Sequence, residues 1–122
     1  MPPINVLLID DEEAFVTTLA ERMELRGLVP RVAFSGQAGL DMIAAEKPDV
    51  VVLDLRMPGM SGAEVLRHIQ AGWPNLPVII LSGHGSEQDL AMCMDLGASL
   101  FHSKPLEIDV LLASIQSLVT QS

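Results

Sequence analysis

The sequence is poor in several residue types on which whole classes of protein depend. Cys93 is the single cysteine among 122 residues, so no internal disulfide can form, and we expect a reducing, cytoplasmic setting. Aromatic residues make up only 3% of the chain, so aliphatic side chains must build its core. Seven basic residues against 16 acidic ones give a formal net charge of −9, which disfavours direct binding to nucleic acid or to anionic lipid.

Long apolar runs are absent as well. No stretch approaches the ~20 apolar residues that a membrane-spanning helix needs, so we expect no contact with a membrane. Residues 1–10 contain neither a basic segment nor a long apolar one, so we expect no signal peptide. The length suits one domain over residues 1–122, and we expect no output domain within this chain.

Short apolar runs alternate with amphipathic patterns five times along the chain. Residues 4–9, 28–34, 50–53, 78–81 and 99–103 are the expected strands. Ser35, Ser61 and Ser86 are placed to begin helices, Gly27 and Gly97 to end them, and Pro105 fits the first turn of the last helix. This alternation predicts an α/β fold with a doubly wound parallel sheet and helices on both faces. The flavodoxin-like strand order 2-1-3-4-5 fits five strands.

The chain is organised around the strand that ends at Asp54. Four consecutive apolar residues, 50–53, show no polar alternation, which is typical of a strand buried on both faces. Pro58, Gly59 and Gly62 follow Asp54 closely and prevent the strand from simply continuing. Asp54 therefore lies at the carboxyl edge of a central parallel strand, where ligands bind in open α/β sheets.

Other polar residues follow strands that end at the same edge. Asp10 and Asp11 follow the first strand, Ser82 ends the fourth, and Lys104 follows the fifth. Clustered carboxylates repel one another, and a hard cation such as Mg²⁺ suits oxygen ligands that have no His or Cys nearby. A lysine and a hydroxyl opposite the carboxylates suit the oxygens of a phosphoryl group.

Six short motifs occur in order along the chain. They are Leu8-Ile9-Asp10-Asp11-Glu12, Val52-Leu53-Asp54, Met57-Pro58-Gly59-Met60-Ser61-Gly62, Ile80-Leu81-Ser82-Gly83, Gly97-Ala98 and Lys104-Pro105. Any one of these motifs is weak, but together and in order they are highly specific. Through them the chain resembles, from residue 4 to about residue 119, the receiver domain of a response regulator from two-component signalling.

The resemblance implies a function in signalling and not as an enzyme in its own right. It implies that Asp54 accepts a phosphoryl group from the phosphohistidine of a histidine kinase or a phosphotransfer protein. It implies that Asp10, Asp11 and Asp54 hold Mg²⁺ together with the backbone carbonyl of Arg56. It also implies that Lys104 pairs with the phosphoryl oxygens.

The resemblance further implies a conformational switch. Ser82 stands at the family's Ser/Thr position, and Phe101 stands at the position of its rotating aromatic residue. Rotation of Phe101 would remodel a face that includes Leu90 and Met94, formed by the fourth helix, fifth strand and fifth helix. A downstream target protein or a second copy of the chain would bind that face.

Simpler interpretations exist for each residue taken alone. Asp54 could cap a turn, acidic residues 10–13 could favour a helix N-terminus, and Lys104 could be a solvated lysine. Ser82 could be an ordinary turn residue, and Phe101 could serve only in packing. The strand-end placement of the whole set favours the site over these readings.

Other functions on related chemistry fit less well. A phosphohydrolase of the haloacid-dehalogenase kind needs a second Asp two residues after the first, and Arg56 stands there. A flavin carrier needs a phosphate-binding loop after the first strand, where this chain is acidic and would repel phosphate. A protein-interaction module that works without phosphorylation remains the alternative.

Overall fold

The computed structural model describes residues 3–83 and 86–120 and shows a parallel five-stranded sheet in the order β2-β1-β3-β4-β5. The sheet confirms the flavodoxin-like order expected from the sequence. The first, second and fifth strands begin one residue later than expected, the second also ends one residue earlier, and the fourth ends one residue later. The strands are β1 (Asn5–Ile9), β2 (Val29–Ala33), β3 (Val50–Leu53), β4 (Val78–Ser82) and β5 (Leu100–Ser103).

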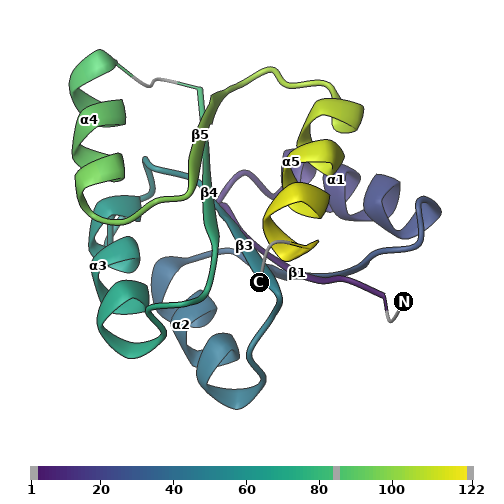
Figure 1. Cartoon of the computed structure of the whole chain (residues 1–122), viewed down its shortest axis with the longest axis horizontal. Helices are drawn as coiled ribbons and strands as arrows, with labels where there is room; N and C mark the ends of the chain where they lie inside the picture. Colours follow the sequence, from purple (N-terminus) through teal and green to yellow (C-terminus); the bar gives the residue numbers. More distant parts are fainter. Residues whose placement is uncertain (1–2, 84–85, 121–122) are drawn as a thin grey trace.

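Helices cover both faces of this sheet, with α1 and α5 on one face and α2, α3 and α4 on the other (Figure 1). Each face has its own apolar cluster against the strands. The helices are α1 (Glu13–Leu25), α2 (Gly36–Ala45), α3 (Gly62–Gly72), α4 (Glu87–Asp95) and α5 (Ile108–Thr120).

Strand β3 shows why the central apolar runs lack polar alternation. Val51 and Leu53 pack into the cluster under α2, α3 and α4, whereas Val50 and Val52 pack into the cluster under α1 and α5. All four side chains are buried because both faces of the strand are covered. The run therefore places Asp54 at the end of a strand in the middle of the molecule.

The expected helix starts are confirmed at Ser35, Ser61 and Ser86. Each serine accepts a hydrogen bond from a backbone N–H in the first turn of its helix. Only at Ser86 is the reciprocal bond also formed, because the Asp89 side chain accepts from the Ser86 N–H. These caps fix where the loops at the carboxyl edge end.

The prediction that Pro105 lies in the first turn of the last helix is wrong. Helix α5 begins at Ile108, and the carbonyl of Glu107 is the acceptor for the N–H groups of Val110 and Leu111. Pro105 instead follows Lys104 through a cis peptide bond, three residues before the helix. Among the described residues, no helix has both the length and the apolar character required to cross a membrane.

Candidate functional site

Asp54 and Asp10 lie side by side where neighbouring strands β3 and β1 end. The register pairs Ile9 with Leu53, so the next residue on each strand is an aspartate. The Asp54 N–H donates to the Ile9 carbonyl at 2.9 Å, and each aspartate is only 5% exposed. Two carboxylates are therefore held close together at the switch point of the sheet, as the sequence predicted.

The loop after Asp54 is pinned from both sides. Leu55 and Met57 are buried, and the Leu55 carbonyl accepts a hydrogen bond of 2.9 Å from the Gly62 N–H at the start of α3. A Cβ atom at Gly62 would lie 2.4 Å from the Asp54 carbonyl oxygen and 2.6 Å from the Leu55 Cα. Only glycine allows α3 to begin this close to the strand end.

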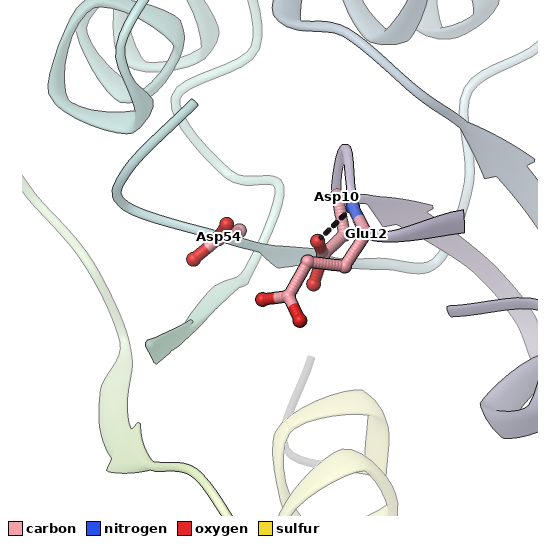
Figure 2. Close-up of side chains that lie close together, drawn as sticks. All are labelled: Asp10, Glu12 and Asp54. Atoms are coloured by element: carbon pink, nitrogen blue, oxygen red, sulfur yellow. Dashed lines mark hydrogen bonds between the residues drawn. The ribbon is translucent and has the colours of Figure 1, made fainter. Parts of the chain in front are cut away.

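A third carboxylate completes a cluster that the sequence only partly predicted. Asp10, Glu12 and Asp54 each offer one oxygen, and these oxygens lie within 4.8 Å of one another (Figure 2). The Glu12 N–H donates to Asp10 Oδ1 at 2.9 Å, which folds residues 10–12 back over the strand end. Glu12 was not among the expected site residues, and its signals in the sequence were the acidic run 10–13 and its place at the end of the motif Leu8-Ile9-Asp10-Asp11-Glu12.

Asp11 lies outside this group of three oxygens but close enough to act on it. Its side chain is partly exposed, and its charge contributes to the raised pKa of Asp54. The assignment of Asp11 and of the Arg56 carbonyl as metal ligands stays a prediction.

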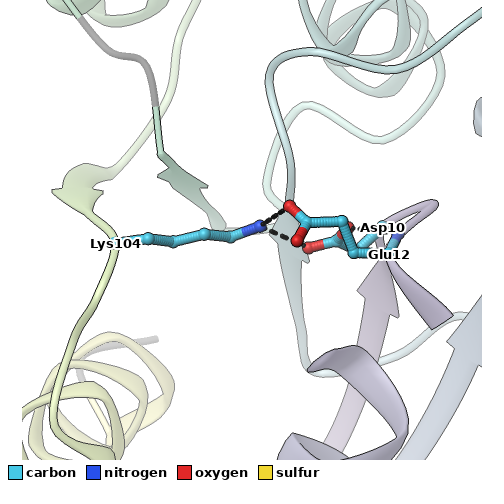
Figure 3. Close-up of polar contacts among 3 residues, drawn as sticks. All are labelled: Asp10, Glu12 and Lys104. Carbon is cyan, nitrogen blue, oxygen red and sulfur yellow. Dashed lines mark hydrogen bonds and ion pairs between the residues drawn. The ribbon is translucent and has the colours of Figure 1, made fainter. Parts of the chain in front are cut away.

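Lys104 extends from the end of β5 towards Asp10 and Glu12 (Figure 3). Its Nζ donates to Asp10 Oδ2 and to Glu12 Oε1, both at 2.9 Å, and lies 4.3 Å from the centre of the Phe15 ring. Burial disfavours the charged ammonium, but the hydrogen bonds to Asp10 and Glu12 outweigh it and raise the pKa of Lys104. The ammonium is thus the cluster's own counter-charge.

Asp54 has an unusual protonation equilibrium. Burial and the charge of Asp10 raise its pKa to about 6, while Lys104 and a backbone hydrogen bond from Arg56 act in the opposite direction. The carboxylate is therefore mostly ionised at neutral pH, and it is less stabilised in that form than an ordinary surface aspartate.

The two predicted switch residues lie on β4 and β5. Ser82 is fully buried at the end of β4, and its carbonyl accepts a hydrogen bond of 2.9 Å from the Lys104 N–H. Phe101 pairs in register with Ile80 and packs, half-buried, against the cluster under α2, α3 and α4. Leu90 and Met94, one turn apart on α4, are 40% and 44% exposed.

The donors fit a hard divalent cation. Among the residues that the structure describes, they are carboxylate oxygens with no nitrogen or sulfur ligand, which suits Mg²⁺ better than a softer metal. Lys104 already neutralises part of their charge, so a cation at this site would compete with the ammonium for Asp10 and Glu12.

Comparison with known proteins identifies the family of this chain. The response regulator receiver domain family matches residues 6–116. The chain is 32% identical over 120 residues to the response regulator MprA of Mycolicibacterium vanbaalenii, and 31% identical over 119 residues to MprA of Mycobacterium tuberculosis. These alignments cover 98% of this chain but 52% of each relative, so the chain spans about half the length of the curated relatives it matches.

Solved structures of receiver domains are also similar to this chain. The receiver domain of the Francisella response regulator 1452 superposes with a TM-score of 0.90 at 30% identity, covering 97% of this chain and 98% of that one. A receiver domain protein from Clostridium thermocellum gives 0.91 at 31%, covering 97% and 95%. A CheY-like receiver domain protein from Methanospirillum hungatei gives 0.93, but at 24% identity it supports the fold alone, covering 98% and 95%.

The chain belongs to the response regulator receiver domain family. It is therefore a signalling domain of two-component systems.

Proposed function

We propose that this domain accepts a phosphoryl group on Asp54 from the phosphohistidine of a histidine kinase or phosphotransfer protein. An Asp54 carboxylate oxygen attacks phosphorus, the P–N bond to the donor imidazole breaks, and the imidazole leaves with the bonding electron pair. The observation that carries the proposal is the ionised, 5% exposed Asp54 beside Asp10 and within the field of Lys104. A nucleophile, its electrostatic partners and a positioned loop are thus assembled at one edge.

Magnesium would be held by Asp10, Asp11, Asp54 and the carbonyl of Arg56, with Glu12 beside them. When bound, Mg²⁺ supplies positive charge that offsets repulsion between the carboxylates and the incoming phosphoryl oxygens. The protein would supply the ligand oxygens and hold them in place through the buried end of β3 and the packed loop that follows it.

Lys104 and Ser82 would donate hydrogen bonds to the oxygens of the phosphoryl group on Asp54. The Lys104 ammonium, now shared between Asp10 and Glu12, can turn to a phosphoryl oxygen without leaving the site. The Ser82 hydroxyl is a donor of the kind that such an oxygen needs. Both roles follow from the position of these residues at the ends of β5 and β4.

The donor has an apolar surface on which to dock. A groove of about 410 Å³ lies between α1 and the start of α5. Phe15, Leu19, Leu106 and Leu111 line it, and Phe15 also lies beneath the Lys104 ammonium. An amphipathic helix of the kinase or phosphotransfer protein fits such a groove and would bring its phosphohistidine towards Asp54.

Phosphorylation would then change the face formed by α4, β5 and α5. Movement of Ser82 towards the phosphoryl group frees space beside β4, and the Phe101 ring can turn into it without stranding a polar group. The ring is half-buried, and Leu90 and Met94 are exposed, so rotation of Phe101 would change the apolar surface of that face. A downstream target protein or a second copy would favour one surface over the other, in the cytoplasm where the kinase acts.

The test is phosphorylation of the purified domain by acetyl phosphate with Mg²⁺, followed by intact-mass spectrometry. Wild type and Asp41→Asn, which removes an exposed carboxylate on α2, should gain a phosphate, and Asp54→Asn should not. Omission of Mg²⁺ should abolish the adduct in every variant. An adduct that persists in Asp54→Asn would move the acceptor elsewhere. No adduct in wild type would favour an interaction module that works without phosphorylation.

A further inference from the structure

The Arg56 side chain joins the loop after Asp54 to the N-terminal cap of α4. Its Nη2 donates to Asp89 Oδ2 at 3.0 Å, across 33 positions of sequence. Asp89 is the third residue of α4, which begins only after the next strand of the sheet. The contact therefore links the phosphoacceptor loop directly to a helix of the proposed output face.

The Asp89 end of this link is part of the cap itself. Asp89 Oδ2 also accepts from the Ser86 N–H at 3.2 Å, and Ser86 Oγ accepts from the Asp89 N–H at 3.1 Å. The hydrogen bond from the Ser86 backbone, aided by Arg56, holds the pKa of Asp89 below its usual range. One carboxylate oxygen thus serves both the helix cap and the guanidinium.

The Arg56 end is fixed through its backbone. Arg56 lies two residues after Asp54, its backbone acts to lower the pKa of the Asp54 carboxyl, and the flanking Leu55 and Met57 are 5% and 9% exposed. Arg56 cannot shift its backbone without moving this loop. A displacement of the Asp54 carboxylate is therefore passed to the base of the Arg56 side chain.

Helix α4 has few buried side chains, so we expect a single polar contact to affect its position more than that of the other helices. Cys93 is its buried residue, whereas Leu90, Met92 and Met94 are exposed. A groove of about 480 Å³ separates it from α3, with Arg56, Arg67, Asp89 and Met92 among the lining residues. The helix therefore has room to change its position against the sheet.

We propose that Asp89 is a positioning residue for the phosphoacceptor site, acting through Arg56, and that this pair couples metal binding at Asp54 to the position of α4. The inference rests on the proposed magnesium site. Because coupling free energies are reciprocal, a contact through which the site acts on α4 must also alter the affinity of the site when it is broken. Loss of Asp89 loosens Arg56 and leaves its charge uncompensated near the metal, and both effects weaken cation binding.

The experiment measures Mg²⁺ dissociation constants by NMR titration for wild type, Asp89→Asn, Arg56→Gln and the double variant. Asn at position 89 keeps an oxygen that can accept from the Ser86 N–H, so the cap should survive, and melting temperatures check this. Arg56→Gln breaks the same contact from its other end, should the α4 variant fold poorly. Asp95→Asn, which removes the same charge from the other end of α4, is the matched control.

We expect Asp89→Asn to weaken Mg²⁺ binding by about twofold to fivefold, the range of a partly exposed ion pair. The same substitution should have no effect in the Arg56→Gln background, and Asp95→Asn should match wild type. Amide signals of residues 87–95 should follow the Mg²⁺ titration in wild type and stop following it once the pair is broken.

Three results would overturn the inference. An equal loss from Asp89→Asn with and without Arg56 would mean that Asp89 acts through its charge alone. An unchanged Mg²⁺ affinity in Asp89→Asn, while wild type binds normally, would remove the coupling and leave the proposed function intact. Failure of wild type to bind Mg²⁺ would overturn both.

Discussion

Lys104 Nζ and Asp10 Oδ2 lie 2.9 Å apart although 94 positions separate the two residues in the chain. Their side chains are 11% and 7% exposed, so this ion pair is largely shielded from solvent. The pair closes the site between the two ends of the chain, and it occupies a carboxylate that the proposed cation also needs. The Lys104 ammonium and the proposed Mg²⁺ therefore compete for the Asp10 carboxylate.

Removal of the internal cation should destabilise the fold. Lys104→Gln leaves the buried Asp10 without its partner, and breaking a buried pair costs about 3 kcal/mol. Urea unfolding at pH 7 without divalent metal measures the loss, and Mg²⁺ should restore part of it. Lys47→Gln, which removes an exposed lysine, is the control and should match wild type. Equal stability of Lys104→Gln and wild type would show that the pair contributes nothing.

Mg²⁺ should raise thermal stability in wild type. Binding to the folded state alone adds RT ln(1 + [L]/Kd), or about 1.4 kcal/mol at ten times Kd. Melting curves at fixed ionic strength measure the shift. We expect Asp11→Asn to abolish it and Glu12→Gln, which only frees Lys104 from an exposed partner, to retain it. The reverse pattern would assign the ligand to Glu12 instead of Asp11.

Without metal, the free energy of unfolding should fall as the pH rises from the unfolded pKa of Asp54 to its folded pKa. Its folded pKa of about 6 lies above the ordinary value of 3.8, so between them the folded state holds a proton that the unfolded chain has lost. The free energy of unfolding therefore decreases from about pH 4 to pH 6. Asp54→Asn should be more stable than wild type at pH 7.5 by about 3 kcal/mol and lack this slope.

Chemical denaturation at pH 4.5 and 7.5 in the presence of a chelator tests this pH dependence. Asp41→Asn, with its carboxylate exposed on α2, should keep the wild-type slope. A slope of the same size in Asp54→Asn would attribute the pH dependence to another group.

Glycine at position 62 should be required for the geometry of the site. Gly62→Ala places a methyl group against the backbone of Asp54 and Leu55, so α3 or the loop must move. We expect a loss of about 2 kcal/mol in stability and a lower rate of phosphorylation by acetyl phosphate. Gly72→Ala, where nothing lies within 4 Å of the added atom, should be neutral or slightly stabilising. Equal effects of the two substitutions would contradict the close approach.

A beryllofluoride mimic of the phosphoryl group should report the switch. In wild type with Mg²⁺, NMR signals of Phe101, Leu90 and Met94 should shift together with those near Asp54 and Ser82. Asp54→Asn should abolish every shift. Shifts confined to the loops around Asp54 and Ser82 would refute the switch and leave the acceptor chemistry standing.

Much of the fold could be predicted from local patterns. The unbroken apolar run before Asp54 indicated a strand buried on both faces, and both clusters of the core do meet across β3. Ser35, Ser61 and Ser86 marked helix starts correctly because a cap depends on residues only three positions apart. The start of α5 was mispredicted from Pro105, since a proline preference at a first turn does not say which residue supplies the first acceptor carbonyl.

The sequence was enough to predict that Asp10, Asp54, Ser82 and Lys104 share one edge of the sheet, because parallel strands bring their carboxyl ends together. Which side chains contact one another at that edge became clear from the three-dimensional structure alone. It selected Glu12 from the acidic run, directed Lys104 to Asp10 and Glu12, and joined Arg56 to the α4 cap. These contacts depend on side-chain directions and on distances between elements far apart in the chain, and periodicity along a sequence carries neither.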